Sequence, residues 1–184
     1  MKGAFLKCIK EMVITQHGED QWLKILNASS YPASKPIMAT ATVPDEQIFA
    51  VMKETRKQLR QSKNQFYDSF SDYWICIFGP RLSPRHYEEA NNSREFIKLL
   101  DDIHARVRRR MRGAEPPDIR LRWIDEDTLE LRYESQRNLI DLMAAMVRAL
   151  GRYYDDDVER VDRIDDNTLR VCFTCLADDV SAAQ

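Results

Sequence analysis

The sequence feature that most constrains the fold is a change in the spacing of apolar residues at about Pro117. Upstream of it, apolar side chains recur every three or four residues, a period typical of amphipathic helices. Downstream, Ile119, Leu121 and Trp123 alternate with charged residues, as in a half-buried strand. The chain is therefore expected to be helical in its first part and to form a sheet later.

The sheet is predicted from two hairpins. The first reverses at residues 125–127 and returns through the alternating apolar residues of 129–133. The second reverses at residues 165–167 and returns through 169–173, and a helix over about residues 138–153 separates the two hairpins. This order, strand–strand–helix–strand–strand after a helical part, predicts an α+β fold with a four-stranded antiparallel sheet.

Turn-forming residues divide the upstream part into helices. His17-Gly18 ends the first helix, and Pro44-Asp45-Glu46 opens another with acids at its positive end. An apolar stripe from Phe66 to Ile77 is expected to stop at Gly79-Pro80. Asn92 or Ser93 is expected to cap a further helix that runs to about Met111.

Composition sets limits on the function. The chain has 184 residues and a formal net charge of −2, which suits one domain and disfavours nucleic acid or an anionic membrane as a partner. No apolar run is long enough to span a bilayer, and the polar N-terminal stretch does not resemble a secretory signal. The protein is expected to be cytoplasmic.

Four scattered cysteines do not suggest a disulfide framework. Only Cys172 and Cys175 lie close in sequence, and a closed zinc site needs more ligands than these two supply. Structural or exposed cysteines, and a redox or zinc sensor, both remain open for this pair.

His104 lies in an unusual place for a histidine. Leu100, Ile103, Val107 and Met111 form one apolar face of the predicted helix, and His104 falls inside that face. A neutral imidazole there needs partners for its two nitrogens. Haem iron or zinc is one solution, and a hydrogen bond to the backbone of the core is the other.

Tyr133, Ser135 and Arg137 continue the inward row of the strand if the segment stays extended. An inward guanidinium needs an anion, and arginine suits a carboxylate or phosphate. The alternatives are an Asp or Glu partner, or exposure because the strand has ended. Taken with His104, the three side chains describe a cofactor that needs one axial nitrogen and a carboxylate clamp, which fits haem.

A run of arginines follows His104, at positions 106, 108, 109, 110 and 112. It is interpreted as a solvated helix end, with a docking surface for a partner and nucleic-acid binding as the alternatives. The sequence contains no phosphate-binding glycine loop, nucleophile elbow or zinc-protease motif, so no enzymatic activity is expected.

Several motifs together resemble the H-NOX family, the haem nitric oxide/oxygen binding domains that include the regulatory domain of soluble guanylate cyclase. They are, in order, Met1-Lys2-Gly3, His17-Gly18-Glu19-Asp20 with Trp22, Leu99-Leu100-Asp101-Asp102-Ile103-His104, Ala114-Glu115-Pro116-Pro117 and Tyr133-Glu134-Ser135-Gln136-Arg137. The resemblance spans nearly the whole chain.

The resemblance implies haem b (iron protoporphyrin IX) as the cofactor. His104 would be the axial ligand, Tyr133, Ser135 and Arg137 the propionate clamp, and Pro117 the residue pressed against the porphyrin. It also implies one domain over residues 1–184, in which haem lies between a helical distal part (about 1–60) and a proximal part with the sheet (about 61–184).

The family lines its gas pocket at positions that correspond here to Phe5, Ile9, Trp74, Phe78, Leu142 and Met146. Oxygen-binding members have a tyrosine where this chain has Leu142, so the resemblance implies a sensor that binds NO and CO and binds oxygen weakly or not at all. Whether the Trp74 indole N–H donates to the ligand is left open.

The output is expected to pass to a separate signalling protein such as a histidine kinase or a cyclic-di-GMP enzyme, as in bacterial relatives. The alternatives are a haem-free interaction module of the same fold, and a redox or zinc sensor built on Cys172 and Cys175.

Overall fold

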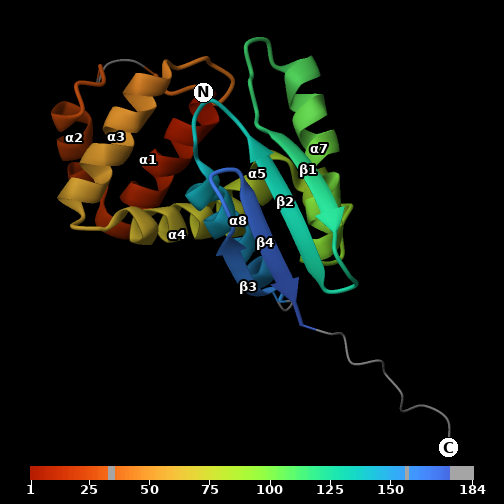
Figure 1. Cartoon of the computed structure of the whole chain (residues 1–184). Coiled ribbons are helices and arrows are strands. Elements are labelled where there is room, and N and C mark those ends of the chain that lie inside the picture. The colour runs from red at the N-terminus through yellow and green to blue at the C-terminus, as the bar shows by residue number, and fades with distance from the viewer. Residues whose placement is uncertain (33–35, 156–157, 175–184) are drawn as a thin grey trace, which may run out of the picture.

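A computed structural model of the chain describes residues 1–32, 36–155 and 158–174. Figure 1 shows α1, α2 and α3 gathered on one side of the molecule, with the sheet and α7 on the other. The elements in chain order are α1 (Gly3–His17), α2 (Glu19–Ala28), α3 (Asp45–Gln58), α4 (Lys63–Tyr73), η1 (Trp74–Phe78), α5 (Gly79–Leu82), α6 (Pro84–Glu88), α7 (Ser93–Arg110), β1 (Asp118–Trp123), β2 (Thr128–Glu134), α8 (Ile140–Tyr154), β3 (Val158–Arg163) and β4 (Thr168–Phe173).

The four strands form one antiparallel sheet in the order β1-β2-β4-β3. Leu129 and Leu131 of β2 and Leu169 and Val171 of β4 are completely buried, because alternate residues of these strands face the core. Helix α7 contacts β1, and α8 contacts β3 and β4. The α+β fold with a four-stranded antiparallel sheet is confirmed.

Local signals set the helix boundaries that position the site. Gly18 has a φ of 85° and separates α1 from α2, a conformation that a residue with a Cβ rarely adopts. Asn92 caps α7, since its side-chain oxygen accepts a hydrogen bond of 2.8 Å from the Glu95 N–H. Among the helices of the described segments, none has the length and apolar character needed to cross a membrane.

The prediction that Gly79-Pro80 stops the helix after α4 is wrong. The helix continues through a π turn, η1, into α5. Because a π turn spaces its hydrogen bonds by five residues, it rotates the side chains that follow relative to an α-helix. Ile77, expected in the apolar stripe, is 45% exposed, whereas the next residue, Phe78, is buried.

Candidate functional site

His104 projects from the second half of α7. Its Nδ1 atom is buried and has no hydrogen-bond partner among the residues that the structure describes. Burial, and to a lesser extent the positive charge of Arg108, lower the His104 pKa to about 4, and a hydrogen bond to the Pro117 backbone partly opposes them. The imidazole is therefore neutral at physiological pH and keeps a lone pair, the form that ligates a metal.

The helix surface around His104 is incompletely covered. The buried residues of α7 all lie in its first half, from Ser93 to Leu100. Ile103, Val107 and Met111, which share a face with His104, are only half-buried. This surface has the apolar character that a flat, mostly apolar cofactor requires.

Pro117 lies in the loop between α7 and β1, where its backbone meets the His104 ring. Its side chain is half-buried. The structure thus brings together two of the predicted site residues, one from the helix and one from the loop that follows it.

Tyr133 is buried near the end of β2. Burial raises its pKa, and hydrogen bonds with the Ser135 side chain and the Leu139 backbone act in the opposite direction. The strand ends at Glu134, so the expectation that Ser135 and Arg137 continue its inward row is wrong. The backbone turns after Ser135, and this turn, not strand periodicity, sets the direction of Arg137.

Arg137 is held by two acidic residues. Its Nε donates to Asp45 Oδ2 at 2.7 Å, Nη1 donates to the Glu115 carbonyl at 2.6 Å, and Nη2 donates to Glu115 Oε2 at 3.3 Å. Its side chain is only 15% exposed. Arg137 is thus a half-buried guanidinium that already binds carboxylates, the chemistry expected of a propionate clamp.

Asp45 was missed as a site residue by the sequence reasoning. Besides Arg137, its carboxylate binds the ammonium group of Met1. Burial raises the Asp45 pKa, but the hydrogen bonds and charges of Met1 and Arg137 outweigh it and hold the pKa below its usual range. Its place at the first turn of α3 is the one signal in the sequence, and it points to helix capping only.

The predicted gas-pocket residues come from three elements: Phe5 and Ile9 from α1, Trp74 and Phe78 from η1, and Leu142 and Met146 from α8. The ring centroids of Phe5 and Trp74 are 5.3 Å apart, as are those of Trp74 and Phe78, so the aromatic members form a continuous row. Ile9, Phe78 and Leu142 are buried, and the other three are half-buried. All six belong to one apolar cluster or pack against it.

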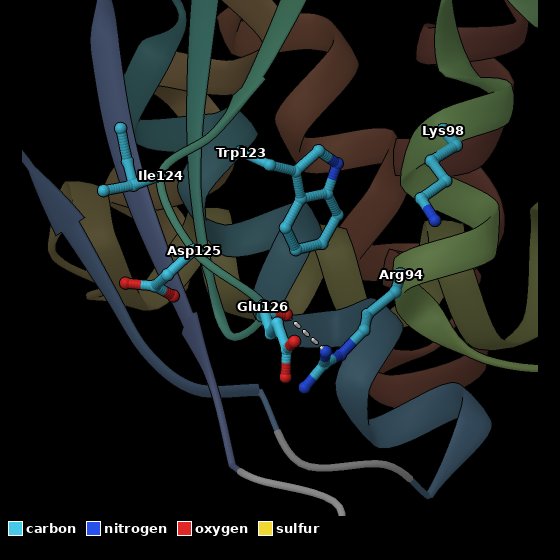
Figure 2. A pocket seen from close by; sticks show the side chains of 6 residues that line it. All are labelled: Arg94, Lys98, Trp123, Ile124, Asp125 and Glu126. Atoms are coloured by element: carbon cyan, nitrogen blue, oxygen red, sulfur yellow. Dashed lines mark hydrogen bonds between the residues drawn. The ribbon is translucent and has the colours of Figure 1, made fainter.

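A hollow of about 490 Å³ lies elsewhere, between the start of α7 and the β1–β2 turn. Figure 2 shows the Trp123 ring between the sheet and Lys98, with Arg94 bonded to the Glu126 carbonyl. Arg94 also binds the Asp127 carboxylate and the Thr174 carbonyl, so three of its hydrogen bonds go to the protein itself. None of the residues predicted to hold haem or gas lines this hollow.

The structure describes only one of the two cysteines of the redox or zinc hypothesis. Cys172 is a half-buried thiol on β4, and Cys175 lies outside the described residues. Within the described ranges, no three His, Cys, Asp or Glu side chains group as a metal site.

Comparison with known proteins shows the family. The sequence model of the HNOB family, described as haem-NO-binding, matches residues 2–161. The chain belongs to the haem-NO-binding family. Members of this family, the H-NOX domains, are haem-based gas-sensor domains rather than catalytic ones. The resemblance found in the sequence motifs is thereby confirmed.

Solved H-NOX structures share the fold. An H-NOX protein from S. oneidensis in the Fe(II)NO state is 15% identical, with a TM-score of 0.83 over 93% of this chain and 97% of that one. An oxygen-binding H-NOX domain related to soluble guanylate cyclases, solved as its oxygen complex, is also 15% identical, with a TM-score of 0.78 over 95% of each chain. A search of curated proteins finds no match.

Proposed function

We propose that this chain binds haem b through His104 and senses nitric oxide. The observation that carries the proposal is the half-buried, neutral His104 imidazole, whose buried Nδ1 atom has no partner in the described part of the chain. An unpaired buried nitrogen costs free energy unless a ligand or a ring rotation satisfies it. The bound haem would supply a ferrous iron that takes up the gas.

The remaining residues of the site would hold and orient the cofactor. Arg137, with Tyr133 and Ser135, would bind propionate, and this requires the carboxylate to compete with or join Asp45 and Glu115 at the guanidinium. Pro117, beside His104, would limit the position of the porphyrin. The half-buried inner face of α7 would gain cover from the macrocycle.

Ligand choice would follow the chemistry of the distal side chains. Leu142 is buried and offers no hydrogen-bond donor, and its proposed neighbours are apolar or aromatic. Bound dioxygen carries charge that a distal donor stabilises, whereas NO needs much less help. We therefore propose NO and CO as ligands, with weak or no binding of oxygen, and a separate signalling protein such as a histidine kinase or a cyclic-di-GMP enzyme as the receiver.

One observation favours the haem-free alternative. Asp45 and Glu115 satisfy Arg137 without any carboxylate from a cofactor. A haem-free interaction module would retain these ion pairs, whereas the haem protein would exchange at least part of them. The two functions also differ in the absorption spectrum of the purified protein, because only the haem protein has a Soret band.

The test is the visible spectrum of protein loaded with haem and reduced without oxygen. A Soret band is expected, and it should shift with NO and with CO. His104→Gly should lose the axially ligated spectrum, and added imidazole should restore it. A His104→Gly spectrum identical to that of the wild type would exclude His104 as the ligand.

His86 offers the matched control. It is another half-buried histidine, in α6, whose Nδ1 is already bonded to the Ser83 hydroxyl at 2.7 Å. His86→Gly should leave the haem spectrum unchanged. Absence of any Soret band in wild-type protein supplied with haem would favour the haem-free module.

A further inference from the structure

Four arginines form a surface on the side of α7 opposite His104. Arg106, Arg109 and Arg110 come from the last turns of α7, and Arg85 comes from α6, which contacts α7. We call these four residues the arginine surface. Arg85, Arg109 and Arg110 are exposed, and Arg106 is half-buried.

His86 lies close to three of these arginines. Burial lowers the His86 pKa most, and the charges of Arg106, Arg85 and Arg110 lower it further, against the opposing effect of Glu89. Guanidinium groups from two helices therefore act on one imidazole. Arg85 of α6 and Arg106 and Arg110 of α7 therefore form one region of positive potential, and Arg109 lies next to Arg110 in the sequence.

Glu89 balances at most one of the positive charges of this region. Glu89 serves two arginines at once, with 2.7 Å from Oε1 to Arg85 Nε and 3.6 Å from Oε2 to Arg106 Nη1. Arg109 and Arg110 form no ion pair with any residue that the structure describes. Their guanidinium groups remain available to a partner.

The arginine surface lies behind the predicted ligand of the haem iron. Arg106 follows His104 by two residues, which places it about 200° further around the helix axis. One face of α7 therefore carries His104, and the opposite face carries the arginines. A displacement of this half of α7 would move both together.

We propose that the arginine surface docks an acidic segment of a partner protein. The inference rests on the proposed function, because it names the surface by which a change at His104 is read. Arginine forks bind carboxylates in a bidentate manner, which suits aspartate and glutamate side chains. The overall net charge of −2 opposes binding to nucleic acid or to an anionic membrane, so positive charge confined to one helix end suits a local acidic segment.

The test uses the haem-loaded, reduced protein and a fluorescein-labelled octaglutamate peptide as the probe. Fluorescence anisotropy should show binding at low salt that weakens as salt is raised. The triple substitution Arg106→Glu, Arg109→Glu and Arg110→Glu should weaken binding by about tenfold or more. The matched control reverses three exposed arginines of the sheet, Arg120, Arg132 and Arg160, with the same change in net charge.

Equal weakening in both triple variants would overturn the proposal, since the effect would then be one of net charge alone. Failure of the wild type to bind the peptide would overturn it as well. Tighter binding of a 20-base-pair DNA duplex, or of phosphatidylserine vesicles, than of octaglutamate would assign the surface to those partners instead. The haem spectrum of each variant is recorded in parallel, so a lost Soret band, which counts against the haem proposal, is distinguished from lost docking.

A second measurement tests the connection to His104. The peptide affinity should differ about fivefold or more between the unliganded and NO-bound ferrous protein, because two coupled sites bias each other reciprocally. Equal affinities in the two states would overturn the surface as an output of the sensor.

Discussion

Helices α7 and α8 flank the same sheet, but they are packed very differently. In α8, nine of 15 residues are buried, and they are distributed from Ile140 to Gly151. In α7, four of 18 residues are buried, and all four precede Asp101. α8 is thus fixed along its length, whereas α7 is anchored by its capped first half and carries His104 on its less covered second half.

This difference assigns the two helices different tasks. Burial of apolar surface is the main source of folding free energy, so α8 contributes much more to the stability of the fold. A segment with few buried contacts opens or shifts at lower free-energy cost. The predicted metal ligand therefore lies on the half of α7 that the polypeptide itself packs less closely, where the proposed haem would supply the missing cover.

The largest expected effect concerns the turn that leads into α8. Arg137→Ala should weaken haem binding by about 2–5 kcal/mol if the ion pair with propionate is largely buried. The rate of haem transfer to apomyoglobin measures this loss. Arg122→Ala, at an exposed position of β1, is the control and should transfer haem at the wild-type rate. Equal rates for all three proteins would remove Arg137 from the clamp.

Burial of His104 makes the stability of the haem-free protein depend on pH. In the folded protein the His104 pKa is about 4, below the ordinary value of 6.5, so the unfolded chain binds the proton more readily. This contribution to stability is present above about pH 6.5 and is lost as the pH falls towards 4, by up to about 3 kcal/mol.

Urea unfolding of haem-free protein between pH 4 and 7 measures the effect. His104→Gln should flatten the pH dependence in this window, because glutamine does not titrate. His17→Gln, at an exposed position at the end of α1, should retain the wild-type dependence. An unchanged profile for His104→Gln would show that other groups control acid unfolding.

Matched substitutions of one valine in each helix compare how tightly α8 and α7 are packed. Val147→Ala removes methyl groups from a fully buried position of α8 and should lower the free energy of unfolding by about 2 kcal/mol. Val107→Ala makes the same change at a half-buried position of α7 and should cost roughly half as much or less. Equal costs in urea denaturation of the haem-free protein would contradict the difference in packing.

Helix α8 also carries the residue proposed to select the gas. Leu142→Tyr should raise oxygen affinity, because a hydrogen bond to charged dioxygen contributes roughly 1.5–3 kcal/mol, or about tenfold to a hundredfold. Overpacking of this buried position would reduce the gain. Leu142→Phe adds the ring without the hydroxyl and should not raise the affinity. Oxygen titration of the ferrous proteins measures both, and a stable oxygen complex of the wild type in air would contradict the assignment to NO.

Much of this fold follows from local patterns in the sequence. Alternation predicted β2 and β4, the central strands of the two hairpins, because alternate residues of these strands are buried. Asn92 and Gly18 marked helix boundaries through side-chain capping and backbone conformation, which depend on neighbouring residues only. His104 was predicted as a candidate ligand because it is a polar residue within an apolar helical face.

Features that depend on distant contacts were not predicted. The ion pair between Asp45 and Arg137 joins residues 92 positions apart, and neither neighbourhood encodes the other. The direction of Arg137 depends on the turn that follows Ser135. The alternating sequence pattern continues past the end of β2 at Glu134 and so gives no sign of this turn. The incomplete cover of the second half of α7 was also missed, because apolar spacing identifies a face but not what packs on it.

The π turn of η1 has a consequence for sequence alignment. A π turn places one more residue in a helix than an α-helical path of the same length would use. A relative that lacks this extra residue would keep the same helix axis but would align with a one-residue gap between Trp74 and Phe78. Positions before and after such a gap differ in their offset, so gas-pocket residues must be matched by superposition of coordinates, not by counting from one end of the helix.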